Sequence, residues 1–247
     1  MDRRLLALVL VGFALVALVR LGRGGETSLP PATPASLADG VGRTEHAARS
    51  AVAEKVPDPE IEQARQLLRE AGTSVYLDAM LLGSDSVVRR WVVPAEGTLR
   101  VAYLGSDVPG WSAELLEISR DALTGWEGVG LPFRFVETLD TTGADLVIRW
   151  ISGFASDRTG QADVHWDSRG RILHADIQLA LSDPTGRALP PEGLRAVVLH
   201  EVGHALGLPH SDDGKDLMYP TTSRAVLTSR DSASMRLLYR LPLVSLR

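Results

Sequence analysis

The chain has 247 residues, of which 26 are Lys or Arg and 31 are Asp or Glu, so its formal net charge is −5. This acidic balance argues against a nucleic-acid partner, because contacts to phosphates need a basic surface. The sequence has no cysteine, which excludes disulfides, thiolate metal ligands and a cysteine nucleophile. The length allows one sizeable domain with appendages.

In the first segment, residues 1–21, arginines flank a long apolar run. Arg3 and Arg4 precede an uncharged run over residues 5–19, whose length lies between that of a signal-peptide core and that of a membrane span. Three interpretations remain open: an uncleaved signal anchor, which we favour, a cleaved signal peptide, and a buried core helix. Either of the first two predicts a domain anchored to a membrane on its extracytoplasmic side, or secreted if the segment is cleaved.

Two further segments precede the main domain. Residues 22–56 are rich in Gly, Pro, Ala, Ser and Thr and predict a flexible linker, because such a composition buries little. Residues 57–89 predict a helical N-terminal extension, with one helix over residues 59–71 that ends at Gly72. Part of the stretch that follows is also expected to be helical. The extension could brace the domain or act as a pro-segment.

Residues 90–247 form the compact unit. Apolar periodicity predicts strands over residues 98–104, 132–137, 144–151 and 171–181, and helices over residues 111–126, 194–207 and 232–240. The strands lie in the middle of the unit and the helices alternate with them or follow them. This order indicates a mixed α/β or α+β domain.

The segment from residue 200 to residue 210, HEVGHALGLPH, carries the chemistry. His200 and His204 are four residues apart on a predicted helix, so both imidazoles project from one face and can share one metal ion. Gly207 permits a left-handed turn that ends the helix and lets His210 return as a third ligand. Three neutral imidazoles leave one position open on a tetrahedral Zn²⁺, as in a catalytic site. Glu201, beside the first ligand, can reach a metal-bound water.

This motif, with the Leu-Met-Tyr-Pro that follows it, resembles the matrixins, the metzincin branch that includes the matrix metalloproteinases. The resemblance implies an α+β metzincin-like catalytic domain with a twisted mixed β-sheet, an active-site helix, a Met-turn at Met218 and a C-terminal helix. It also implies that Asp231 anchors the Met-turn, and that Tyr219 and Pro220 contact the substrate. The absence of cysteine excludes the propeptide cysteine that holds many matrixins latent.

The strand over residues 171–181 resembles the upper edge strand on which matrixins hold an extended substrate. By that resemblance His174, Ala175 and Asp176 would contact the substrate. His165, Asp167 and His174 also resemble part of a second, structural metal site of the family. The alternative is that the two histidines are strand residues that face solvent or substrate. We expect one catalytic Zn²⁺, and neither a structural zinc nor a calcium ion.

Together these features predict a zinc-dependent endopeptidase that cuts a protein or peptide by a metal-activated water, with Glu201 as general base and His200, His204 and His210 as metal ligands. We expect a monomer that contacts a membrane through its N-terminal segment. The main alternative is a membrane-tethered, non-catalytic binding module with a structural zinc. Hydrolysis of an amide bond outside proteins is a further alternative.

Overall fold

The computed structural model describes residues 58–77, 87–94 and 97–245. The proposed signal segment and linker, residues 1–21 and 22–56, lie outside these residues. Among the helices of the described part, none has the length and apolar character needed to cross a membrane.

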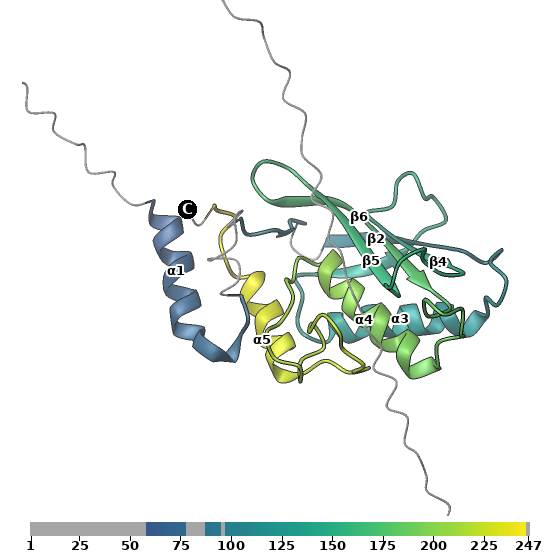
Figure 1. Cartoon of the computed structure of the whole chain (residues 1–247). Helices are drawn as coiled ribbons and strands as arrows, with labels where there is room; N and C mark the ends of the chain where they lie inside the picture. The colour runs from purple at the N-terminus through teal and green to yellow at the C-terminus, as the bar shows by residue number, and fades with distance from the viewer. Residues whose placement is uncertain (1–57, 78–86, 95–96, 246–247) are drawn as a thin grey trace, which may run out of the picture.

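A six-stranded sheet forms one layer of the domain (Figure 1). Its order is β1-β6-β4-β2-β3, and all neighbours along this path are parallel. The remaining strand, β5, pairs with β6 in the antiparallel direction. The strand bounds are β1 Arg90–Trp91, β2 Gly97–Leu104, β3 Phe133–Glu137, β4 Leu146–Ile151, β5 Gly160–Trp166 and β6 Arg171–Ala180.

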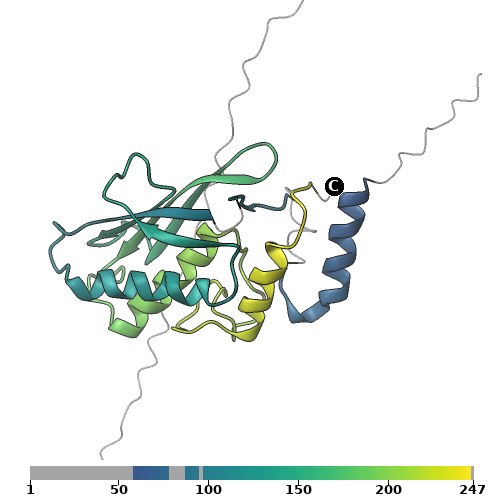
Figure 2. The ribbon, with the colours of Figure 1, turned by 180° about the vertical axis from the view of Figure 1, so that it is seen from behind.

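Two long helices, α3 (Ala113–Glu127) and α4 (Pro191–Ala205), cover one face of this sheet, as both ribbon views show (Figures 1 and 2). The two helices are held together at Trp126, which is fully buried and whose indole N–H donates to the carbonyl of Leu199 at 3.0 Å. This packing fixes the position of α4, the helix that carries the metal-binding motif.

Two other helices lie together at one end of the domain (Figures 1 and 2). They are α1 (Pro59–Ala71), which is followed by the short 3₁₀ turn η1 (Gly72–Ser74), and α5 (Ser229–Leu238). Side chains of α1 and of the segment after η1 join the same buried apolar cluster as the sheet and α4: Ala64, Leu68, Val75, Tyr76 and Leu77. The N-terminal extension therefore shares the core of the main domain.

The seven elements predicted for residues 90–247 and the helix over residues 59–71 are all present, with ends that differ by a few residues. The α+β fold class is confirmed. Two strands were not predicted, β1 and β5. Helical structure was also expected after residue 72. Among the described residues of that stretch, only the single turn η1 is helical, and residues 78–86 lie outside the described part.

The prediction that residues 171–181 form an edge strand is wrong. The strand over these residues, β6, pairs with β4 along one side and with β5 along the other. Its backbone groups are therefore used within the sheet and cannot hold a substrate strand. Next to β6, the strand β5 pairs with no other strand among the described residues, so one of its sides is unpaired.

Candidate metal centre and active site

The C-terminal half of α4 and the turn after it bring three imidazoles together. His200 and His204 are buried, and the Nε2 atom of His204 lies 3.1 Å from the Nε2 atoms of both His200 and His210. The return of His210 depends on Gly207, which has φ +103° and lies so close to Arg89 that a Cβ would sit 2.3 Å from its carbonyl oxygen. Only glycine satisfies both conditions.

Backbone carbonyls fix the orientation of two of the rings. The Nδ1–H of His200 donates to Leu217 O at 2.9 Å, and the Nδ1–H of His204 donates to Leu208 O at 2.8 Å. Because a carbonyl can only accept, Nδ1 carries the proton in both rings and each Nε2 presents a lone pair. These lone pairs converge at a separation close to the roughly 3.3 Å that a tetrahedral Zn²⁺ with bonds of about 2.0–2.1 Å requires. The donor set therefore fits zinc.

Burial keeps these imidazoles neutral. Desolvation lowers the pKa of His200 to about 3, although its bond to Leu217 opposes the shift. Desolvation also lowers the pKa values of His204 and His210, and the neighbouring imidazoles add to the effect at His204. Neutral imidazole is the form that binds a metal. Among the described residues, these three form the only group of three or more His, Asp or Glu side chains whose ligand atoms lie within 4.8 Å of one another.

Glu201 lies beside the first ligand and is fully buried. Neither of its carboxylate oxygens has a hydrogen-bond partner among the described residues. Desolvation raises its pKa to about 8, with the charge of Arg158 opposing the shift and that of Asp163 adding to it. A buried carboxylate without a partner costs stability, so its presence calls for a functional reason.

The space for the Glu201 side chain depends on Gly160, the first residue of β5. A Cβ at Gly160 would lie 2.5 Å from the Oε1 atom of Glu201 and 2.7 Å from Val197. The start of β5 therefore lies directly over the carboxylate.

The predicted Met-turn lies against α4 and α5. Met218 is fully buried, and a Cβ at Gly203 would lie 2.4 Å from its Sδ atom, so this glycine allows the turn to approach the helix. Asp231 accepts hydrogen bonds from the backbone N–H of Leu217 at 2.9 Å and of Met218 at 3.3 Å. The expected anchoring contacts of Asp231 are therefore present, and Leu217 links them to His200.

The other residues named from the sequence lie in two places. Tyr219 and Pro220 are half-buried and directly follow the Met-turn. Ala175 of β6 is fully buried. The carboxylate of Asp176 accepts a hydrogen bond from the Nε2–H of His174 at 2.9 Å. Because β6 is paired on both sides, the basis for assigning substrate contacts to His174, Ala175 and Asp176 is lost.

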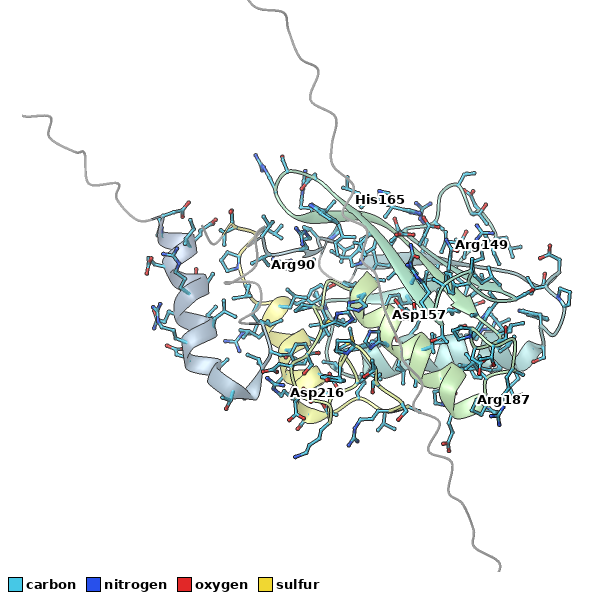
Figure 3. The ribbon with its side chains drawn as sticks, viewed as in Figure 1. Arg90, Arg149, Asp157, His165, Arg187 and Asp216 are labelled. Atoms are coloured by element: carbon cyan, nitrogen blue, oxygen red, sulfur yellow. The ribbon has the colours of Figure 1, made fainter. Side chains whose placement is uncertain are left out.

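The residues suggested for a second metal do not converge in the described structure. His165 and His174 are cross-strand neighbours whose ring centroids lie 6.1 Å apart. The Asp167 carboxylate is engaged in the hairpin turn instead, where it accepts from the backbone N–H of Arg169 and from Arg171. Figure 3 shows His165 on the β5–β6 hairpin, well apart from Asp216, which lies in the loop after His210.

The sequence did not predict several of the residues that shape the site through contacts with distant parts of the chain. Gly160 and Gly203 have no local signature, and nothing in the sequence indicates that Trp91 donates its indole N–H to Ala205 O at 2.9 Å, at the end of α4. The alternation of small apolar and polar residues in GQADVHW was the one available signal for β5.

Three features define a metzincin-like domain: a parallel sheet with one antiparallel strand, a helix with the H-E-x-x-H motif packed against the sheet, and a methionine turn under the histidines. The sequence profile of the matrixin family matches residues 111–240, which is more than half of the chain. The chain belongs to the matrixin family.

Two curated relatives are similar to part of the chain. The chain is 30% identical over 141 residues to Metalloendoproteinase 1-MMP of Arabidopsis thaliana, an alignment that covers 52% of this chain and 38% of the relative. It is 33% identical over 101 residues to macrophage metalloelastase of Oryctolagus cuniculus, with 39% of this chain and 21% of the relative covered. The chain thus spans well under half the length of these relatives.

Proposed function

We propose that the chain is a zinc-dependent endopeptidase, with His200, His204 and His210 as the zinc ligands and Glu201 as the general base. The proposal depends on one observation: three imidazole Nε2 atoms converge, and the residue next to the first of them, Glu201, has a buried carboxylate with no hydrogen-bond partner among the described residues. The family match and the names of the two relatives, a metalloendoproteinase and a metalloelastase, support the same class of reaction.

Zinc bound by these ligands would lower the pKa of a water and polarise the carbonyl of a peptide bond. The protein's own part is proton transfer. Glu201 accepts a proton from the attacking water and delivers it to the leaving amine. Burial brings the pKa of this carboxyl near neutrality, which suits a group that must both take and give a proton.

The proposed substrate site follows from the free side of β5. An extended peptide can add to this side as a further strand, through main-chain hydrogen bonds. Gly160 begins β5 over Glu201, so a peptide paired along the strand would pass the general base. Tyr219 and Pro220 are proposed to line the pocket that receives one of its side chains.

Several further features stay proposals. We propose that the protein acts as a monomer on a protein or peptide, on the extracytoplasmic side of a membrane or after secretion. The segments that decide between anchoring and secretion, residues 1–21 and 22–56, lie outside the described residues. The domain limits 57–89 and 90–247 also remain predictions.

The test uses the full-length chain loaded with zinc and a peptide library read by mass spectrometry. We expect cleavage that a chelator abolishes and that added zinc restores. Glu201→Gln should retain one zinc per chain and lose turnover, whereas Glu192→Gln, an exposed change on the same helix, should leave turnover unchanged. A protein that binds zinc but cuts no peptide would instead be the non-catalytic binding module.

A further inference from the structure

The segment from residue 72 to residue 77, between α1 and residues outside the described part, lies against α5 and the Met-turn. The backbone N–H of Tyr76 donates to Ser234 Oγ at 3.1 Å, and its hydroxyl donates to Asp231 Oδ1 at 3.0 Å. Tyr76 is 3% exposed, so both bonds are shielded from water. We call residues 72–77 the strap.

The phenol of Tyr76 completes the set of groups that hold Asp231. The Oδ1 atom accepts from Tyr76 and, at 3.3 Å, from the N–H of Met218, whereas the Oδ2 atom accepts from Leu217 and Thr228. Without the phenol, Oδ1 would keep only the long bond to Met218. Burial, reinforced by the charge of Asp231, raises the pKa of Tyr76 above its ordinary value, so the phenol stays protonated and remains a donor.

Arg230 makes a second connection, to the loop that follows the third histidine. Its Nη1 group donates to Ser211 and, at 2.7 Å, to Asp216, and one Nη2 bond reaches Asp212 at 2.7 Å. The other Nη2 bond and the Nε–H donate to the strap carbonyls of Val75 at 3.1 Å and Thr73 at 3.2 Å. All five N–H groups of the guanidinium are therefore used, in a fork that lysine cannot reproduce.

The two connections meet at the strap. The guanidinium of Arg230 lies 5.3 Å from the centre of the Tyr76 ring, a cation–π contact. From Tyr76 the contacts continue through Asp231 and Leu217 to His200, and from Arg230 they continue through Ser211, which directly follows His210. The strap thus reaches two of the three histidines, in each case through two intervening residues.

We propose that the strap positions the zinc ligands, with Tyr76 and Arg230 as positioning residues, so that this part of the N-terminal extension is a permanent brace of the metal centre and not a removable pro-segment. The proposal rests on the proposed function only in taking zinc as the metal. Groups that hydrogen-bond directly to metal ligands typically contribute 10- to 100-fold to metal affinity or activity, and we take the lower end of this range because Tyr76 and Arg230 act through further residues.

The test measures zinc release from the full-length chain to a competing chelator, and the visible absorption spectrum of the Co²⁺-substituted protein. Tyr76→Phe keeps the ring and removes the hydroxyl. We expect about tenfold faster zinc release, an altered cobalt spectrum, and a lower kcat with an unchanged KM for any peptide that is cut. Tyr103→Phe, a tyrosine on β2 beside Glu137, is the matched control and should behave as the wild type.

Arg230→Lys gives a second, independent measurement if Tyr76→Phe does not fold. It keeps the charge but not the fork, and we expect it to release zinc faster than Arg120→Lys, since Arg120 holds two carboxylates on α3 and β3 instead. Wild-type zinc release and cobalt spectra in both Tyr76→Phe and Arg230→Lys would overturn the proposal. These metal readouts do not depend on cleavage, so a wild type that binds zinc without cutting peptides would refute the peptidase and leave the strap supported.

Discussion

Replacing Glu201 with glutamine should stabilise the metal-free protein while it abolishes turnover. The carboxyl is fully buried, and burial raises its pKa from the ordinary 4.5 to about 8. Below about pH 4.5 the group is protonated in both the folded and the unfolded chain and costs nothing. Between about pH 4.5 and about pH 8 the unfolded chain releases the proton and the folded chain keeps it, so folding stability falls as pH rises.

The size of this penalty can be bounded. The difference between 4.5 and about 8 corresponds to at most about 5 kcal/mol, at about 1.4 kcal/mol per pH unit. Relaxation and water entry reduce such penalties, so we expect a gain of about 2 kcal/mol or more for Glu201→Gln near pH 8. The amide has nearly the same shape as the carboxyl, so packing against Gly160 is preserved.

The assay is urea unfolding of the metal-free, full-length protein at about pH 5 and about pH 8, with wild type, Glu201→Gln and Glu192→Gln compared. The advantage of Glu201→Gln should grow from the lower to the higher pH, whereas the exposed Glu192→Gln should show no such trend. A Glu201→Gln protein that is no more stable than wild type near pH 8 would show that the carboxylate is well solvated. The explanation of its near-neutral pKa would then be refuted.

Three other perturbations test the geometry of the site. Gly160→Ala places a Cβ 2.5 Å from the Glu201 carboxylate, so kcat/KM should fall at least about tenfold with zinc content unchanged; a wild-type kcat/KM would contradict this contact. Gly203→Ala places a Cβ 2.4 Å from the Met218 sulfur and should cost about 1–3 kcal/mol, measured as a lower Tm. Burial lowers the pKa of His200 to about 3, so the unfolded chain takes up its proton at a higher pH than the folded chain does. The metal-free Glu201→Gln protein, in which the opposing contribution of Glu201 is absent, should therefore lose stability from about pH 6.5 down to about pH 3; an unfolding free energy of this variant that stays flat over the range would contradict the burial of the imidazole.

Local patterns in the sequence predicted most of the elements correctly, because helices and strands reveal themselves through the spacing of apolar residues along a short stretch. The helix α4 is such a case, since its apolar residues and the glycine beyond it delimit the element. The strand β5 was missed, because Gln161 and Asp163 alternate with small residues and give a weak signal. Strands pair through backbone groups, which are the same for nearly every residue type. The sequence therefore could not show that β6 is an interior strand and that β5 has an unpaired side.

The sequence by itself was enough to propose the metal ligands and the general base. Residues four apart on a helix share a face, and a glycine turn after the helix can bring back the third imidazole. Only the tertiary structure decided what holds them. Tyr76 and Asp231 lie 155 positions apart in the chain, and Trp91 and Ala205 lie 114 apart. A hydrogen bond between such distant residues leaves no periodicity to detect, because it depends on how the helices and the sheet pack together and not on the spacing of residues within any one of them.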